Sequence, residues 1–179
     1  IQKSQNGYIY DFGQNCAGVL ELEIKGRKGQ RITARHAEVL LNGELFTKPL
    51  RSAKAKLEYV CGGEKETYCP KFTFMGFRYA ELCGIEPENV KVRMKVISSI
   101  DEETGDFFCS NESINRLQKN IRYSGFSNFL EIPTDCPQRD ERQGWMNDAT
   151  VRFQETPYNF DFTRMFEKIV GDLIGAQSP

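Results

Sequence analysis

The chain has 179 residues, of which 39% are hydrophobic and 27% charged, and its formal net charge is −1. This length suits one full domain or two small ones. The basic residues are scattered through both halves, which excludes a strong electrostatic footprint for nucleic acid or an anionic membrane, and no apolar run approaches the roughly 20 residues that a membrane-spanning helix needs.

The first hundred residues show a period of two. Leu20, Leu22 and Ile24 alternate with charged residues, and residues 90–96 repeat the pattern. Such alternation is typical of half-buried strands. Turns that contain glycine and favour positive φ separate these runs, at 26–29, 42–43 and 62–63. Short strands joined by such turns predict an antiparallel β-sandwich.

Two features of this region have both a structural and a functional interpretation. An aromatic cluster is formed by Phe72, Phe74, Phe77 and Tyr79, and we interpret it as sandwich core rather than as a platform for sugar rings. The only histidine, His36, lies in an alternating strand. It is expected to be structural, because the sequence lacks the partners of a catalytic triad or of a histidine-ligated metal.

The six cysteines are spaced without a CxxC pair or a zinc-finger pattern. They are Cys16, Cys61, Cys69, Cys83, Cys109 and Cys136. Several lie in apolar strand runs, where a reduced cysteine behaves as a small hydrophobic residue, so buried thiols are favoured over disulfides. We expect no metal and no cofactor. The compartment stays open, with a cytoplasmic location slightly favoured over a periplasmic or secreted one.

The period lengthens after residue 100, which predicts helices. Ser110 is a suitable N-cap for a helix with an apolar stripe at Ile114, Leu117 and Ile121. Asp161 or Thr163 can cap a later helix, whose apolar residues are Phe162, Phe166, Ile169, Val170 and Leu173. Prolines at 133, 137 and 157 interrupt the region between the two. This region is therefore expected to begin as a loop and to enter a short helix at about 142–154.

That loop carries the most distinctive chemistry of the chain. Residues 135–148 hold four carboxylates, two guanidinium groups and the only tryptophan. Carbohydrate sites combine acids and arginines, which bind ring hydroxyls, with an aromatic wall for the C–H face of the sugar. These parts are supplied by Asp135, Arg139, Trp145 and Asp148. The carboxyl groups that could cleave a glycosidic bond are those of Glu141, Asp140 and Asp135.

Each of these residues also has a structural interpretation. The Arg-Asp-Glu-Arg run at 139–142 is the kind of charge run that is most often a solvated surface with weak ion pairs. A lone tryptophan is by default a core residue. Cys136 is discounted as a nucleophile, because no catalytic histidine accompanies it. From the residues alone, a solvated surface is the favoured interpretation of Asp140 and Glu141.

The order of several segments along the chain reverses that preference. The run 135–148, with 128–134 before it and 158–161 after it, resembles the signature of the bacterial α-L-rhamnosidases, glycoside hydrolase family 78. Five upstream segments are similar to the same family in the same order, at 11–15, 35–40, 43–45, 72–79 and 104–110. The resemblance therefore covers nearly the whole chain.

The resemblance implies several β-domains followed by an α/α barrel of six helical hairpins, in an enzyme that hydrolyses terminal α-L-rhamnosides with inversion. It places Glu141 at the general acid and assigns the substrate-binding positions to Asp135, Arg139, Asp140, Trp145 and Asp148. The general base of the family is a glutamate further along the barrel, which this sequence does not contain. Gln143 and the Met146-Asn147 pair depart from the family pattern, which bears on aglycone preference or on the fine geometry of Asp148 more than on the reaction class.

One electrostatic difficulty accompanies the role of Glu141. Arg139 and Arg142 are expected to favour the ionised glutamate, whereas a general acid must carry a proton before it acts. Desolvation, or the nearby carboxylates of Asp135 and Asp148, would have to oppose the two arginines.

The expected fold class is α+β with two domains, an antiparallel β-sandwich at 1–100 and the first helices of a truncated α/α barrel at 101–179. Six hairpins need about twelve helices of roughly 11 to 12 residues, and only 79 residues follow Ile100. We expect a fragment of a larger enzyme that is inactive alone and whose unburied helix faces could drive self-association. The expected ligand is a carbohydrate, an L-rhamnoside. The alternative is a non-catalytic carbohydrate-binding β-sandwich with a helical docking tail.

Overall fold

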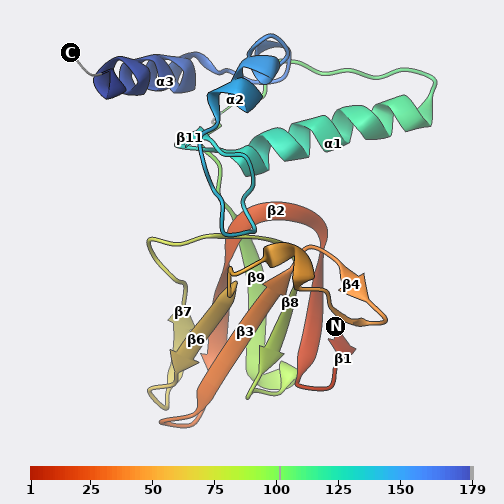
Figure 1. Cartoon of the computed structure of the whole chain (residues 1–179). Coiled ribbons are helices and arrows are strands. Elements are labelled where there is room, and N and C mark those ends of the chain that lie inside the picture. Colours follow the sequence, from red (N-terminus) through yellow and green to blue (C-terminus); the bar gives the residue numbers. More distant parts are fainter. Residues whose placement is uncertain (101, 178–179) are drawn as a thin grey trace. The chain divides into compact units, whose positions relative to one another are not determined.

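The computed structural model describes residues 1–100 and 102–177 (Figure 1). Asp101, the first residue of the predicted second domain, and the last two residues lie outside the described part. The contacts divide the chain into two compact units, one of Ile1–Ile97 with Pro137–Glu141, and one of Ser98–Cys136 with Arg142–Pro179. The domain boundary after residue 100 stays a prediction, and the contacts group a short piece of the acidic loop with the β unit.

The first unit is built from antiparallel strands, as the period of two predicts. The seven strands of its main sheet are β1 (Gln2–Lys3), β2 (Tyr8–Lys25), β3 (Arg31–Ala37), β6 (Lys56–Val60), β7 (Lys65–Tyr68), β8 (Met75–Cys83) and β9 (Val90–Val96). A separate hairpin joins β4 (Leu40–Leu41) to β5 (Glu44–Leu45), and two short 3-10 helices, η1 (Lys48–Leu50) and η2 (Pro87–Asn89), lie between strands.

The long strand β2 organises this unit. Its first part pairs with β1 on one side and β8 on the other, and its second part pairs with β9 and β7. The register to β8 shifts between Asp11 and Cys16, where a bulge lets the strand bend. In Figure 1, β2 is the red-to-orange ribbon that arches over the unit. The single strand β2 thus connects the part of the sheet that contains β1 and β8 to the part that contains β7 and β9.

The core of the β unit follows the predicted alternation. Leu20, Leu22 and Ile24 are buried, while the charged residues between them are partly exposed. Phe77 is completely buried and packs edge-on against His36, with 4.6 Å between the ring centroids. The aromatic cluster is only partly core, however. Phe72 is fully exposed and lies before β8 at a φ of 59°, so its assignment to the core was wrong.

The predicted turns adopt the backbone conformations that their residues favour. Asn42 and Gly43 join β4 to β5 with φ values of 53° and 82°, a pair of positive φ angles that two-residue hairpins require. Gly29 and Gly63 also have positive φ. His36 is buried, as a structural histidine should be, and its Nδ1–H donates to the Ala55 carbonyl at 2.8 Å.

The second unit is mainly helical. Its elements are α1 (Glu112–Asn128), β10 (Phe129–Leu130), β11 (Ile132–Pro133), α2 (Met146–Phe153), η3 (Thr156–Tyr158) and α3 (Thr163–Ala176). The core of the unit comprises Ile100, Phe129, Phe160, Phe162, Met165 and Ile169. None of the helices in the described residues is both long and apolar enough to cross a bilayer.

The helix starts differ slightly from the prediction. The N-cap of α1 is Asn111 rather than Ser110, because the Asn111 side chain accepts hydrogen bonds from the backbone N–H groups of Ser113 and Ile114. At α3, the Asp161 carboxylate accepts from the Thr163 N–H at 3.0 Å, while Phe162 occupies the cap position. Both residues belong to types that serve this purpose well, so a shift of one residue is within what sequence can predict.

Part of the predicted apolar stripes stays exposed. On α1, Leu117 is 58% exposed and Ile114 46% exposed, and on α3 Phe166, Val170 and Leu173 are also exposed. The adjoining side of α3 is covered, since Met165 and Ile169, the latter a member of the predicted stripe, are buried. The helices therefore present apolar surface beyond what the described residues cover, which is typical of a face that other elements bury.

Candidate active site

The acidic motif lies between β11 and α2, and its predicted site residues divide evenly between the two units. The β unit includes the segment with Arg139, Asp140 and Glu141. The helical unit includes Asp135, Trp145 and Asp148. The motif begins as a loop, as predicted, but it enters the helix only at Met146, four residues after the expected start at 142.

Glu141 is held by two guanidinium groups. Its Oε2 accepts from Arg139 Nη2 at 2.8 Å and from Arg51 Nη1 at 3.1 Å. The Glu141 side chain is 24% exposed, so it is neither a solvated surface charge nor fully shut off from water. Sequence reasoning anticipated Arg139 but missed Arg51, which lies 90 residues earlier.

Asp140 is fixed from the same turn of the β unit. Its Oδ2 accepts from the Ser52 hydroxyl and, at 3.2 Å, from the Ser52 backbone N–H. Arg51 Nη1 lies 3.9 Å from the other carboxylate oxygen. The Ser52 hydroxyl, followed by the Ser52 N–H and the Arg51 charge, holds the pKa of Asp140 below its ordinary value, although partial desolvation opposes this. Asp140 is therefore a carboxylate at neutral pH.

A glycine allows the acidic loop to lie directly on the sheet. Gly76 in β8 is buried, and a Cβ added there would lie 2.8 Å from Pro137 Cγ and 2.9 Å from both Gln138 N and Gln138 Cβ. Any other residue at this position would push the loop away from the strand. The three residues that follow Gln138 are the arginine, the aspartate and the glutamate of the motif, so the contact with β8 supports the segment from which their side chains project.

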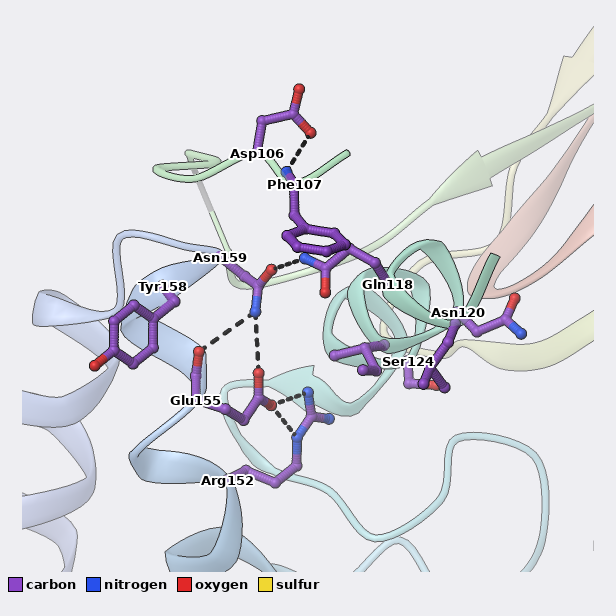
Figure 2. Close-up of a pocket in the computed structure, with 11 residues that line it drawn as sticks. Asp106, Phe107, Gln118, Asn120, Ser124, Arg152, Glu155, Tyr158 and Asn159 are labelled. Atoms are coloured by element: carbon purple, nitrogen blue, oxygen red, sulfur yellow. Dashed lines mark hydrogen bonds and ion pairs between the residues drawn. The ribbon is translucent and has the colours of Figure 1, made fainter. Parts of the chain in front are cut away.

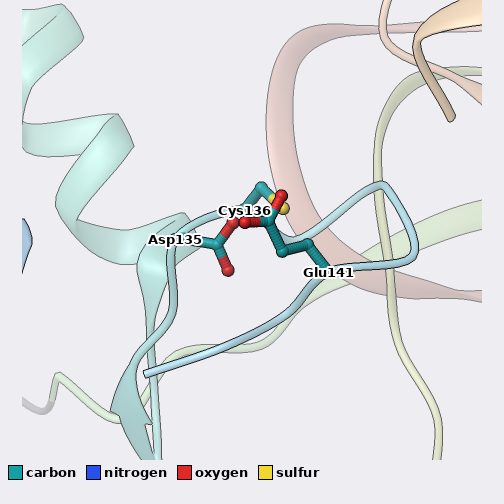
Figure 3. Close-up of side chains that lie close together, drawn as sticks. All are labelled: Asp135, Cys136 and Glu141. Carbon is teal, nitrogen blue, oxygen red and sulfur yellow. Dashed lines mark hydrogen bonds between the residues drawn. The ribbon is translucent and has the colours of Figure 1, made fainter. Parts of the chain in front are cut away.

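In the helical unit, Asp135 closes the base of the loop. The Asp135 N–H donates to the Gln143 carbonyl at 3.0 Å, and the Gln143 N–H donates to Asp135 Oδ1 at 2.6 Å. The Cys136 thiol donates to the other Asp135 oxygen at 3.0 Å. Figure 3 shows the side chains of Asp135 and Cys136, together with Glu141. These hydrogen bonds fix the orientation of the Asp135 carboxylate.

Asp135 and Asp148 line one cavity of about 200 Å³ together with Arg152, Asn128 and Thr134. Asp148 lies in the first turn of α2, where the helix dipole stabilises a negative charge. Trp145 occupies the N-cap position of the same helix and is 50% exposed. Its indole is therefore accessible to a ligand rather than buried in a core.

A second pocket, of about 710 Å³, lies between α1 and the η3 region and contains none of the predicted site residues (Figure 2). Four of its polar side chains, those of Gln118, Arg152, Glu155 and Asn159, bind one another. Arg152 donates twice to Glu155 Oε1, Asn159 donates to Glu155 Oε2 at 3.1 Å, and Gln118 donates to Asn159 Oδ1 at 2.5 Å. A pocket with paired polar groups and apolar walls from Leu117 and Ile121 has the character of a packing surface.

Nucleophilic catalysis by Cys136 and acid or base catalysis by His36 find no geometric support in the described residues. Cys136 is buried and its thiol is hydrogen-bonded to a carboxylate, and the only histidine is enclosed in the β unit, where burial lowers the pKa of His36 to about 4. All six cysteines are thiols in the structure. The expectations of no metal and no cofactor stay predictions.

Comparisons with known proteins agree with the signature that the sequence carries. The family described as bacterial α-L-rhamnosidase concanavalin-like domain matches residues 1–101, and the family described as bacterial α-L-rhamnosidase 6 hairpin glycosidase domain matches residues 102–179. The predicted order of a β domain followed by barrel helices is thereby confirmed. A relative from Formosa agariphila, an α-L-rhamnosidase, is 41% identical over 159 residues, which cover 86% of this chain and 17% of the relative.

Two solved structures show the same fold. The α-L-rhamnosidase from Dictyoglumus thermophilum matches with a TM-score of 0.90 and 38% identity, over 98% of this chain and 20% of that one. The Streptomyces avermitilis α-L-rhamnosidase complexed with L-rhamnose also matches with a TM-score of 0.90 and 38% identity, over 95% of this chain and 17% of that one. The chain spans 17% to 19% of the length of the curated relatives that it matches.

Proposed function

Because the chain belongs to the bacterial α-L-rhamnosidases of glycoside hydrolase family 78, we propose that the complete enzyme hydrolyses terminal non-reducing α-L-rhamnose residues with inversion of configuration. Glu141 is the general acid that protonates the departing glycosidic oxygen. In this proposal residues 1–100 form the β-sandwich domain, and residues 101–179 begin the barrel that completes the site.

The observation that carries the proposal is the environment of Glu141. Its carboxyl group is partly covered, is held by Arg51 and Arg139, and still keeps 24% of its side-chain surface accessible. A proton donor needs this combination, because it must be oriented toward one bond and must also be reachable by the substrate. A solvated charge run would have neither fixed partners nor a defined direction.

The remaining motif residues have roles that suit their chemistry. The carboxylates of Asp135, Asp140 and Asp148 can accept hydrogen bonds from sugar hydroxyls, and Arg139 can donate to those hydroxyls. Trp145 offers an exposed indole to the apolar face or to the methyl group of a 6-deoxy sugar.

Inversion requires a second carboxylate that activates water on the opposite face of the sugar ring. We propose that this general base is a glutamate outside the 179 residues. The isolated chain should therefore not release 4-nitrophenol from 4-nitrophenyl α-L-rhamnoside. Turnover by the purified chain would show that both halves of the acid and base pair are already present in it.

The complete enzyme provides the direct test of the acid. Glu141→Gln should lower kcat by about 10² to 10⁴-fold, and more on an alkyl rhamnoside than on 4-nitrophenyl rhamnoside, because nitrophenolate leaves without protonation. Rhamnose binding should persist. Glu64→Gln, in the exposed turn between β6 and β7, is the matched control and should retain wild-type kcat. Equal losses on both substrates would contradict the role of Glu141 as acid.

The alternative function, a carbohydrate-binding β-sandwich with a helical docking tail, predicts a different result. Calorimetric titration of rhamnose into residues 1–100 should then give saturable heat, and Glu141→Gln should leave hydrolysis by the complete enzyme unchanged. Under the proposed function, binding requires residues of the barrel and the isolated β unit gives no heat.

A further inference from the structure

We infer that Arg51 and Ser52, which follow η1 in the β unit, are positioning residues for the general acid. They act through Asp140 and Glu141, to which they bind, and they orient the loop Pro137–Glu141. The inference rests on the proposed role of Glu141. It means that residues of the β-sandwich help to position the general acid, in addition to any structural support that the β-sandwich provides.

The contacts converge on two adjacent carboxylates. A single guanidinium, that of Arg51, lies 3.1 Å from Glu141 Oε2 and 3.9 Å from Asp140 Oδ1. The next residue, Ser52, donates both its backbone N–H and its hydroxyl to Asp140 Oδ2. Two consecutive residues of one turn thus bind two consecutive residues of the motif, so these contacts fix the position of the loop relative to the turn.

An isolated surface ion pair would carry little weight, since such pairs contribute little to stability and are screened by salt. This group differs because it is a connected network. Besides Arg51, Arg139 donates to the Glu141 carboxylate at 2.8 Å, and the Asp140 side chain is fixed by two donors from Ser52. Networks with several donors restrict side-chain orientation more than single pairs do.

The backbone of Arg51 supports a specific role for this turn. Arg51 has a φ of 56° and a ψ of −118°, in the half of conformational space that glycine occupies most readily. A residue with a side chain persists there only when its surroundings require it, and such residues concentrate at functional sites. The side chain of Arg51 is the feature that a glycine could not supply, because it carries the guanidinium to Glu141.

Orientation matters because proton transfer requires the acid within hydrogen-bond reach of the glycosidic oxygen. Misplacement of a reacting group by about 1 Å can lower a rate by about 10²-fold. If Arg51 and Ser52 fix the loop, their removal should impair the step that needs the acid and should leave sugar binding nearly intact. A merely structural role would lower the amount of folded enzyme without such selectivity.

The test compares Arg51→Ala, Arg51→Lys and Ser52→Ala in the complete enzyme with Arg27→Ala, a matched change at an exposed arginine in the turn between β2 and β3. Arg51→Ala should lower kcat at least about tenfold on an alkyl rhamnoside and less than about threefold on 4-nitrophenyl rhamnoside, with KM and rhamnose affinity nearly unchanged. Arg51→Lys should recover only part of the loss, because lysine keeps the charge but lacks the planar, preorganised guanidinium.

Hydrogen exchange of the peptide that covers 137–141 gives a second reading that does not depend on activity. Arg51→Ala and Ser52→Ala should speed exchange in that peptide while β2 and β8 keep their protection, and Arg27→Ala should not change it. If the wild-type enzyme fails to hydrolyse rhamnosides, the proposed function falls, and the exchange data still decide whether the turn holds the loop. Unchanged exchange, or equal kinetic losses on both substrates, would overturn the inference.

Discussion

The buried histidine makes a quantitative prediction about the β unit. His36 is 2% exposed, and burial lowers its pKa from the ordinary 6.5 to about 4, although its hydrogen bond to the Ala55 carbonyl acts in the opposite direction. Acidification below pH 6.5 therefore protonates the histidine in the unfolded chain before it does so in the folded one. The folded state loses stability as the pH falls from about 6.5 to about 4, and above pH 6.5 this residue contributes no pH dependence.

The size of the effect follows from that difference in pKa. About 2.5 pH units at roughly 1.4 kcal/mol per unit give about 3.5 kcal/mol in all. Because the folded-state histidine is half protonated at pH 4, about 3 kcal/mol of the free energy of unfolding is lost between neutral pH and pH 4. Several carboxylates with lowered pKa values, such as that of Asp11, also destabilise the folded state in acid. The contribution of His36 must therefore be measured as a difference between proteins.

Two measurements isolate it. His36 is the only histidine, so its ring resonances in the NMR spectrum are unambiguous and should titrate with a midpoint near 4. His36→Gln, which retains a donor for the Ala55 carbonyl, should show a flatter decline of unfolding free energy between pH 6.5 and 4, by about 3 kcal/mol over that range. A midpoint near 6.5 in the folded protein would refute the reasoning, because it would mean that the ring is exposed to water.

Two further predictions concern backbone positions. Gly76→Ala should destabilise the β unit by about 1 to 3 kcal/mol and lower rhamnoside hydrolysis by the complete enzyme, since the added Cβ would lie 2.8 Å from Pro137 Cγ. The control is Gly171→Ala in α3, where a Cβ meets no atom within 4 Å, and it should be neutral or stabilising by up to about 1 kcal/mol. If the two variants had equal effects on thermal stability and on hydrolysis, the close approach at Gly76 would be contradicted. Asn111→Ala should lower the free energy of unfolding by about 1 kcal/mol through loss of the α1 cap, whereas Ser110→Ala should change it by less than about 0.5 kcal/mol. Denaturant unfolding measures both, and a larger loss for Ser110→Ala would show that Ser110 is the N-cap.

Much of the fold could be predicted because its signals are local. The alternation around Leu22, the turn at Asn42 and Gly43, and the stripe on α1 each depend on neighbours in the sequence. The errors arose where neighbouring residues are equally suited to one structural role, so that the sequence alone does not decide between them. Ser110 and Asn111 are both good caps, and Phe72 resembles its buried neighbour Phe77 in every respect except that it precedes the strand.

The site was harder to predict, because its contacts are distant in sequence. The signature at 135–148 could be identified, but nothing near Arg51 or Ser52 indicates that they bind carboxylates 88 to 90 residues away. The sequence holds 24 lysines and arginines, and any of them could have been the second partner of Glu141. Likewise, Gly76 reads as an ordinary glycine in a strand until the loop that lies on it is known.

The double pairing of β2 has a consequence for synthesis on the ribosome. This strand is complete at Lys25, but its neighbours β8 and β9 end at Cys83 and Val96, so about 70 more residues must be translated before β2 can pair along its length. At about 5 to 20 residues per second the nascent strand waits on the order of ten seconds with its edges open. Synonymous codon changes that slow translation between residues 25 and 96 should therefore increase the fraction of nascent protein that aggregates.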